Sequence, residues 1–403
     1  MVNIGTRHRP LRETPVRRVR DHRIDLVRGF ALVTIFINHM PGNWIGAWTP
    51  RNFGFSDSAE IFVLLAGYAS ALAFYPLCQR RDFAILTLKA VRRAGVLYGA
   101  HLVTTGAAFL LFWAIIAASG NAEHADLVGM APALADPAAS LRAVLVGGFQ
   151  LSYFNILPLY VVLLALLPIM LALAALDTRL LVAASVLAYL VTNLAGLTLP
   201  SSPHFESWFF NPIAWQSLFV AGLVLGILRL NGNMIGYHPA LFAAATGFII
   251  FAAVWTMHGY RTLGEGALPE WLGSLQKPNL PVPRLGHALA LAYVTCHCRI
   301  WAWLAHKPKD FVLTRMGRHS LPVFMAGSLL SMTGWIVVSE IQGGVLVQTV
   351  VALTGLTVMA ALALWLDGDL GLYWPVCASR GAFGTQMAGL PRLQPHYRPN
   401  LPV

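Results

Sequence analysis

Charged residues are scarce in this chain of 403 residues, where they make up 11% against 57% hydrophobic residues. A soluble domain carries about 25% charged residues. The chain therefore has too little polar surface for a soluble fold of its length, and we exclude one. Long apolar runs recur along the sequence instead, which is typical of an all-α polytopic membrane protein.

Cysteine is also rare, with four residues at positions 78, 296, 298 and 377. All four fall in or beside apolar runs or on the side that we place in the cytoplasm, so no disulfide framework is indicated. Cys296 and Cys298 would point about 200° apart on a helix. We therefore expect no metal site there, and no tightly bound cofactor.

Acidic residues are fewer than basic ones, 17 against 28, which gives a formal net charge of +11. The basic residues gather in short segments between apolar runs, as topology signals do. No basic segment is interleaved with aromatic residues in the manner of modules that bind single strands. The charge thus predicts contact with membrane lipids rather than with nucleic acid.

Apolar runs long enough to cross a bilayer predict about ten transmembrane helices. They fall at 25–43, 58–76, 94–118, 152–176, 180–197, 213–229, 240–257, 286–305, 319–338 and 345–366. Seven arginines precede Ile24, and no small-residue cleavage site follows the first run, so we expect a retained first helix. The predicted organisation is a basic tail (1–23), a membrane domain (24–366) and a cytoplasmic tail (367–403).

The basic residues also predict an orientation. With the N-terminus in the cytoplasm, the cytoplasmic loops include "CQRRDFAILTLKAVRR" (78–93) and "HKPKDFVLTRMGRH" (306–319). The loops on the other side, 44–57, 119–151 and 198–212, contain only Arg51 and Arg142 among their lysines and arginines. This asymmetry favours an N-in, C-in topology.

The first predicted helix carries ionisable residues on one face. Arg28 and His39 are eleven positions apart, which is about 20° from three full turns, so they share a face about 16 Å apart along the axis. Asp25 falls near the same face, within reach of an i,i+3 ion pair with Arg28. Anchoring the helix end is the alternative role for Asp25 and Arg28, whereas an intramembrane histidine is a functional candidate by default.

The second predicted helix begins with Ser56, Asp57 and Glu60. Ser56 or Asp57 would cap the helix, and Glu60 lies one turn further in. The turn between the two helices is short, so we expect Glu60 to approach His39. A carboxylate beside an imidazole fixes its tautomer and raises its basicity, which would make His39 a usable general base.

Several segments carry a family resemblance. The Arg28-x10-His39 spacing resembles the superfamily of integral-membrane acyltransferases. Taken in order, five segments resemble the OpgC family: "RIDLVRGFALVTIFINHMPGN" (23–43), "GFSDSAEIFVLLAGYASAL" (54–72), "NILPLYVVLL" (155–164), "NPIAWQSLFVAGLVLG" (211–226) and "GRHSLPVFMAG" (317–327). Two positions depart from the pattern: Ala66 replaces a serine, and "VFMAG" lacks the histidine found in many superfamily members.

The resemblance implies a multi-pass enzyme of the bacterial inner membrane that transfers an acyl group from cytoplasmic acyl-CoA to a periplasmic glucan. His39 would act as general base with Glu60 as its partner, and Asn38 would stabilise the oxyanion or make an interhelical hydrogen bond. The expected contacts to the CoA phosphates are Arg28, Lys89, Arg92, Arg93, Arg315 and Arg318.

Polar residues near the outer ends of predicted spans are candidates for the acceptor site, with capping and helix packing as the alternative. They are Asp57, Asn155, Tyr160, Asn211, Trp215 and Gln216. Arg51 is the candidate for binding the free carboxylate of a succinyl donor. The sequence leaves open whether the donor is succinyl-CoA or acetyl-CoA, whether an acyl-histidine forms, and what the oligomeric state is. It also leaves open a transporter or flippase that uses the polar face as a relay.

Overall fold

The computed structural model describes residues 21–368 except 122, 200, 202–207, 234 and 260–275. Helices are the regular elements of this described part, which contains no strand. The predicted all-α architecture is therefore confirmed. Both predicted tails, 1–23 and 367–403, lie outside the described residues except for 21–23 and 367–368.

Eight helices of the described part are long and apolar enough to cross a membrane, by length and composition. They are α2 (Ser58–Gln79), α3 (Phe83–Ser119), α7 (Ile156–Leu176), α8 (Thr178–Ala195), α9 (Pro212–Leu230), α10 (Pro239–Val254) counted with the helical turn that continues it to His258, α16 (Ser320–Glu340) and α17 (Val345–Leu366). The chain is therefore a multi-pass membrane protein. The predicted N-in, C-in orientation stays a prediction.

Two shorter helices occupy the remaining predicted spans. Helix α1 (His22–Asn38) has 17 residues and α13 (Val282–His297) has 16, somewhat fewer than the roughly 20 that a full crossing needs. Helix α1 ends at Asn38 rather than at residue 43, so His39 is its C-cap residue. The run 286–305 is interrupted at Cys298, whose extended backbone separates α13 from α14 (Arg299–Ala305).

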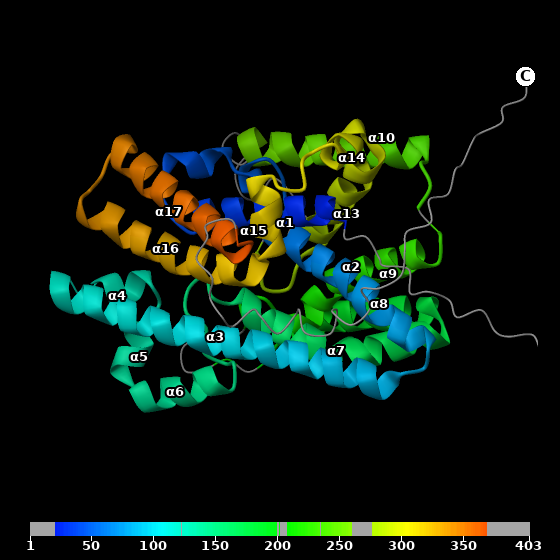
Figure 1. The fold of residues 1–403 in the computed structure, drawn as a ribbon, viewed down its shortest axis with the longest axis horizontal. Helices are drawn as coiled ribbons and strands as arrows, with labels where there is room; N and C mark the ends of the chain where they lie inside the picture. Colours follow the sequence, from blue (N-terminus) through cyan, green and yellow to red (C-terminus); the bar gives the residue numbers. More distant parts are fainter. Residues whose placement is uncertain are drawn as a thin grey trace, which may run out of the picture.

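Short helices fill the connections. They are η1 (Trp44–Trp48), η2 (Pro50–Asn52), α4 (Glu123–Leu127), α5 (Ala131–Ala135), α6 (Pro137–Leu145), η3 (Trp255–Gly259) and α15 (Val312–Arg318). Helices α4 to α6 lie together near one end of α3 (Figure 1). They form most of the connection 119–151 that the sequence predicts as a loop.

Helix α3 is longer than predicted. It has 37 residues, about 55 Å of helix, and begins at Phe83 inside the segment 78–93 that was predicted as a loop. That prediction is wrong from Phe83 onward. The reason is that Leu86, Ala90, Ala94 and Leu97 are buried at spacings of three and four residues, so the apolar face continues past the charged residues between them.

Close packing of two helix pairs positions the centre of the bundle. A Cβ atom at Gly222 of α9 would lie 2.0 Å from the carbonyl oxygen of Leu64 on α2, and one at Gly317 of α15 would lie 1.7 Å from that of Asp25 on α1. Only glycine allows backbones to approach this closely. These contacts hold α1 and α2 in the middle of the bundle, between α10 on one side and α3 with α7 on the other (Figure 1).

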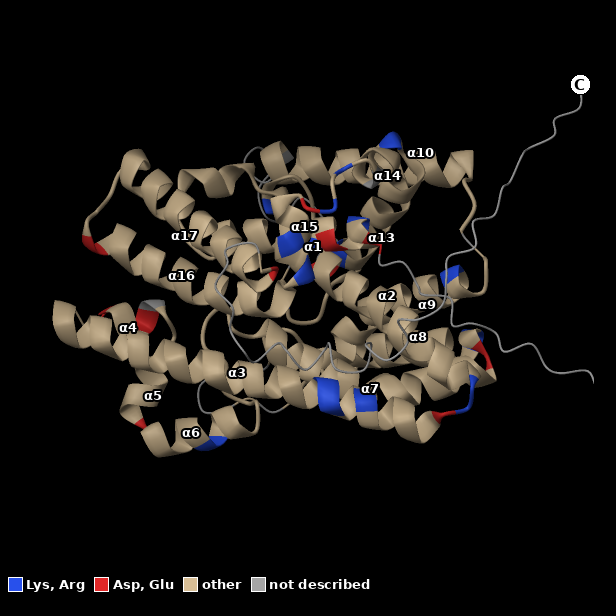
Figure 2. Ribbon diagram, in the orientation of Figure 1, with Lys and Arg blue, Asp and Glu red and all other residues tan. Residues whose placement is uncertain are grey.

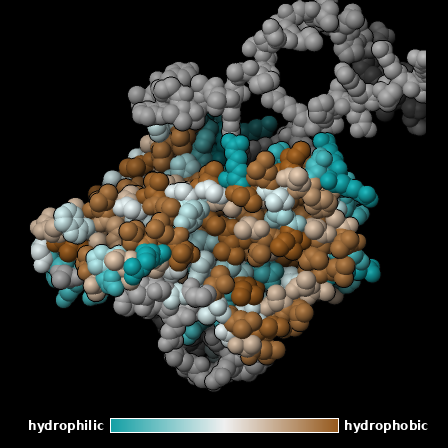
Figure 3. Space-filling view, turned by 90° about the horizontal axis from the view of Figure 1, so that it is seen from below, coloured by the Kyte–Doolittle hydropathy of each residue, from teal (hydrophilic) through white to brown (hydrophobic). Residues whose placement is uncertain are grey.

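The exterior is largely apolar and the charges are concentrated. One face of the molecule shows hydrophobic residues over much of its described surface (Figure 3), as a lipid-facing surface requires. On the ribbon, many of the charged residues gather around α1, α13 and α15 (Figure 2). Charges placed inside an apolar bundle point to a functional site in its interior.

Candidate active site

A cavity of about 100 Å³ lies at the end of α1 and contains His39. We call it the His39 cavity. Its polar lining is Asn38, His39, Arg51, Asp57, Ser58, Asn155 and Lys277, and aromatic side chains such as Tyr153, Phe209 and Phe210 complete the wall. The residues come from segments far apart in the chain, so the bundle assembles the site.

The imidazole of His39 contacts an aromatic ring in a tilted arrangement. Its ring centroid lies 4.3 Å from that of Tyr153. Within the described part of the chain, the buried Nδ1 of His39 has no hydrogen-bond partner. Tyr153 has φ +65°, which costs a residue with a side chain roughly 1–2 kcal/mol. The surrounding structure thus maintains a strained residue that fixes the ring of His39.

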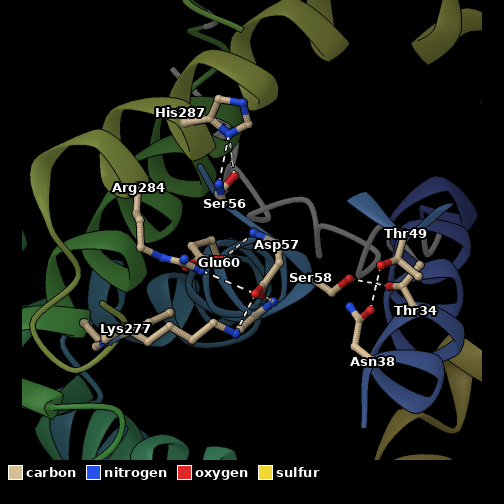
Figure 4. A network of polar contacts seen from close by, with 12 residues as sticks. Thr34, Asn38, Thr49, Ser56, Asp57, Ser58, Glu60, Lys277, Arg284 and His287 are labelled. Atoms are coloured by element: carbon tan, nitrogen blue, oxygen red, sulfur yellow. Dashed lines mark hydrogen bonds and ion pairs between the residues drawn. The ribbon is translucent and has the colours of Figure 1, made fainter. Parts of the chain in front are cut away.

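Asn38 lies beside His39 and is partly engaged. Its Oδ1 accepts a hydrogen bond of 2.6 Å from the Thr49 hydroxyl, which orients the amide. Thr34 of α1 and Ser58 of α2 share a hydrogen bond that ties the two helices together (Figure 4). Asn38 therefore lines the His39 cavity with an amide whose Oδ1 is bonded to Thr49.

Four charged side chains form a network at the start of α2, three of them buried and the fourth, Lys277, partly exposed (Figure 4). Asp57 and Glu60 make a capping box, in which Asp57 caps the helix and its own N–H donates to Oε2 of Glu60 at 2.8 Å. Arg284 of α13 contacts Oε1 of Glu60 at 2.6 Å and Oδ2 of Asp57 at 3.4 Å. Lys277 completes the network with an ion pair of 2.5 Å to Asp57.

Lys277 is positioned by the start of α9. The indole N–H of Trp215 donates to the carbonyl oxygen of Lys277 at 3.0 Å. The next two residues of this segment are held by Asn211, whose N–H donates to Pro278 and whose side-chain amide donates to Asn279. Trp215 and Asn211 thus fix the segment that brings Lys277 into the His39 cavity.

The structure does not bring Glu60 to His39. Glu60 is fully buried, both of its carboxylate oxygens are engaged by the network, and it is absent from the lining of the His39 cavity. The capping box turns its carboxylate back toward Asp57, and Arg284 holds it there. Asp57 is the carboxylate that lines the same cavity as His39. The role of Glu60 in catalysis stays a prediction.

Asp57 is held in its charged form. Burial by itself would raise the pKa of this carboxyl, but the charges of Lys277 and Arg284 outweigh burial and keep the pKa below its ordinary value. A buried carboxylate flanked by two cations is stable as an anion. Asp57 therefore brings a permanent negative charge to the cavity that contains His39.

A second cavity, of about 250 Å³, lies along the other half of α1. We call it the Arg28 cavity. It is lined by Arg28 and Arg93 and otherwise mostly by apolar side chains, with Ser70, Ser320 and Tyr160 as further polar residues. The buried hydroxyl of Tyr160 has no hydrogen-bond partner in the described structure. Arg28 donates to the Leu65 carbonyl at 3.2 Å. Tyr160 thus lies in this cavity, away from the acceptor region predicted for it.

The other predicted phosphate contacts lie apart from both cavities. Lys89 and Arg92 are exposed on α3. Arg315 and Arg318 surround Asp367, with Arg318 at 2.9 Å and His319 at 2.7 Å from its carboxylate oxygens. Burial alone would raise the pKa of Asp367, but His319 and Arg318 lower it below its ordinary value. Asp367 is therefore an anion that compensates this basic cluster.

The predicted acceptor residues divide into two groups. Asn155 and Asp57 line the His39 cavity, and the exposed Arg51 lies at its edge. Asn211, Trp215 and Gln216 line neither cavity. Asn211 caps α9, and Gln216 donates to the Ser185 carbonyl at 2.9 Å. These two have the capping and packing roles that the sequence leaves as the alternative.

Sequence reasoning missed Lys277, Arg284 and His287. His287 contacts the Ser56 hydroxyl through Nδ1 at 2.7 Å, next to the network. Arg284 and His287 are three residues apart in an otherwise mostly apolar helix, and intramembrane ionisable residues of this kind indicate a site. Among the described residues, no group of three or more His, Cys, Asp or Glu is placed to hold a metal ion.

Comparison with known proteins adds one finding. Residues 20–369 match the family described as OpgC protein, and this range includes every element of the fold and the site. No curated protein and no solved structure matches the chain significantly.

Proposed function

The chain belongs to the OpgC family, and from that membership we propose that it is an O-acyltransferase moving a succinyl group from cytoplasmic acyl-CoA to a hydroxyl of a periplasmic glucan. Membership and the membrane-span helices fit a membrane acyltransferase in general. The observation that supports the finer proposal is the placing of two cavities in series along α1. One contains two arginines and the other contains His39.

The Arg28 cavity suits the donor. Acyl-CoA carries several phosphates on a long, thin pantetheine arm, and arginine binds phosphate through paired, charge-assisted hydrogen bonds. Arg28 and Arg93 would hold the phosphate end, and the mostly apolar wall would cover the arm. The thioester would then lie toward the His39 cavity, in the direction of the C-terminal end of α1.

The His39 cavity suits the transfer step. His39 would take the proton of an acceptor hydroxyl as its oxygen attacks the thioester carbonyl, and the amide of Asn38 would donate to the developing oxyanion. The new carbon–oxygen bond forms as the carbon–sulfur bond breaks, and His39 returns the proton to the leaving CoA thiolate. The acceptor becomes an ester and CoA leaves as the free thiol.

The charged network would support this step. Asp57 would balance the positive charge that His39 gains, while Glu60 would act indirectly by holding Asp57 and Arg284 in place. Arg51, exposed at the edge of the cavity, would bind the free carboxylate of a succinyl donor. An acetyl group has no such carboxylate, so a contact with Arg51 would favour succinyl-CoA over acetyl-CoA, the two donors that the sequence leaves open.

The test is acyl transfer by the purified protein in liposomes, with succinyl-CoA or acetyl-CoA as donor and periplasmic glucan as acceptor. We expect CoA release and a matching increase in glucan mass. His39→Ala should lower the rate by about 10²-fold or more, the usual contribution of a general base.

The matched control is His101→Ala, which removes another buried histidine, on α3, that lines neither cavity. It should retain transfer. Full transfer by His39→Ala would show that the general-base role is wrong. Gradient-driven transport without consumption of acyl-CoA would show that the protein is a transporter and not an acyltransferase.

A further inference from the structure

The Arg28 and His39 cavities have a common wall. Of all the residues that line them, three belong to both: Phe62 of α2, Ile156 of α7 and Phe324 of α16. Each comes from a different helix, so three separate elements contribute the lining that the two cavities share. We call them the Phe62–Ile156–Phe324 partition.

The partition is apolar and closely packed. Ile156 and Phe324 are buried, with 7% and 6% of their surface exposed. Phe62 packs against Tyr160 of the Arg28 cavity, with ring centroids 5.9 Å apart. No side chain of the partition can bind a phosphate, a carboxylate or water through a hydrogen bond. A polar group of a donor therefore has no hydrogen-bond partner among the side chains of the partition.

The partition lies where a donor must pass. Arg28 and His39 are about 16 Å apart along α1, with one in each cavity. A linear donor whose phosphates are bound near Arg28 reaches His39 only by placing its acyl end beyond the three side chains. The width of the opening between two aromatic rings and one branched side chain then decides which acyl groups arrive.

We propose that the Phe62–Ile156–Phe324 partition is the specificity determinant for the acyl group, admitting narrow, unbranched chains to His39 and excluding wide ones. The inference rests on the proposed acyltransferase function and adds residues that do not take part in the chemistry. A hydrophobic constriction also limits the passage of water between the cavities, which protects the thioester from hydrolysis.

The experiment measures kcat/KM for a wide donor, benzoyl-CoA, and for succinyl-CoA. The variants Phe62→Ala and Phe324→Ala each remove one ring of the partition. The expected result is a rise of about 10-fold or more in the ratio of benzoyl to succinyl transfer, the size of effect that a change of pocket shape produces. CoA release without acceptor should also rise as water gains access.

The matched control removes a ring that lies outside both cavities. Phe112 is a completely buried phenylalanine of α3 that lines neither of them. Phe112→Ala should keep the wild-type ratio within about two-fold. Truncating a core phenylalanine leaves a cavity that destabilises the fold, so Phe62→Leu and Phe324→Leu serve as second variants that keep most of the packing. They should shift the ratio in the same direction by a smaller factor.

The outcomes separate this inference from the proposed function. Wild-type protein that consumes no acyl-CoA overturns both. Wild-type protein that transfers acyl groups, with partition variants that keep the wild-type ratio, overturns the specificity role alone. A ratio that rises equally in Phe112→Ala also overturns it, because the effect would then come from general loosening of the bundle.

Discussion

Arg284 is the side chain that allows two carboxylates to lie side by side inside the bundle. It contacts both Asp57 and Glu60, its own side chain is 8% exposed, and Glu60 is completely buried. A buried anion without a partner is far less stable than the same anion in water. Removing one member of such a network therefore costs more than replacing a charged pair together.

We predict that Arg284→Met lowers the free energy of unfolding by about 3–5 kcal/mol, because Glu60 loses its partner and Asp57 keeps only Lys277. The double variant Arg284→Met with Glu60→Gln should be less destabilised, since it leaves no unpaired charge at position 60. Denaturation in detergent micelles measures both. Arg299→Met, at an exposed position of α14, is the control and should change stability by about 0.5 kcal/mol or less. Equal losses in the single and double variants would contradict the pairing argument.

The residues of the site differ in how far the sequence predicts them. His39 and Arg28 are recognisable because one helix carries both at a spacing that places them on one face. Lys277 is not, because its position depends on hydrogen bonds from Trp215 and Asn211, about 60 positions earlier in the chain. The contact expected between Glu60 and His39 is absent from the described structure for a related reason. A short turn brings the two helices together, but Arg284, which is distant in sequence, binds the Glu60 carboxylate instead.

At the scale of the helices, glycine decides how closely α2 and α9 approach. Gly67 and Gly222 each face a backbone carbonyl of the other helix, with hypothetical Cβ distances of 1.9 and 2.0 Å. Backbone atoms cannot move aside as side chains can. The start of each helix contributes to the site, α2 through Asp57 and Glu60 and α9 through the residues that hold Lys277, so this contact also sets the geometry of the charged network.

We predict that Gly222→Ala separates α2 from α9 and lowers the thermal unfolding midpoint and the yield of folded protein. Gly247→Ala on α10 is the matched control, because a Cβ there meets nothing within 4 Å. At such an open helical position, alanine is favoured over glycine by about 1 kcal/mol, so the control should be neutral or more stable. The midpoint in detergent measures both. A Gly222→Ala variant as stable as Gly247→Ala would show that the helices tolerate a wider separation.

Helix positions are predicted well where the signal is local, and helix ends are missed where it is not. Each of the ten predicted spans overlaps a helix because length and hydropathy are local properties. The start of α3 is not predicted because Lys89, Arg92 and Arg93 lower the mean hydropathy of this segment. The opposite face of the helix is nevertheless apolar and buried. The break at Cys298 lacks a proline or glycine signal, so nothing in the sequence of 286–305 marks it.

For the whole molecule, orientation determines which substrate each cavity can meet. The proposed donor is cytoplasmic acyl-CoA and the proposed acceptor is periplasmic, so the proposal requires the Arg28 cavity to face the cytoplasm and the His39 cavity to face the other side. The N-terminal part of α3 carries Lys89, Arg92 and Arg93, while α4 to α6 follow its other end. The side of the membrane on which each end of α3 lies therefore indicates which side each cavity faces.

We predict that a cysteine at Lys89 is labelled from the cytoplasmic side and a cysteine at Ala138, exposed on α6, from the periplasmic side. The variants Lys89→Cys and Ala138→Cys are made in a chain whose four native cysteines are replaced by serine. A membrane-impermeant maleimide added to intact spheroplasts should label only Ala138→Cys, and added to inverted vesicles only Lys89→Cys. A permeant maleimide, which should label both, controls for reactivity. The opposite pattern would place the Arg28 cavity on the periplasmic side, where no acyl-CoA could reach it, and would remove the basis for a cytoplasmic donor.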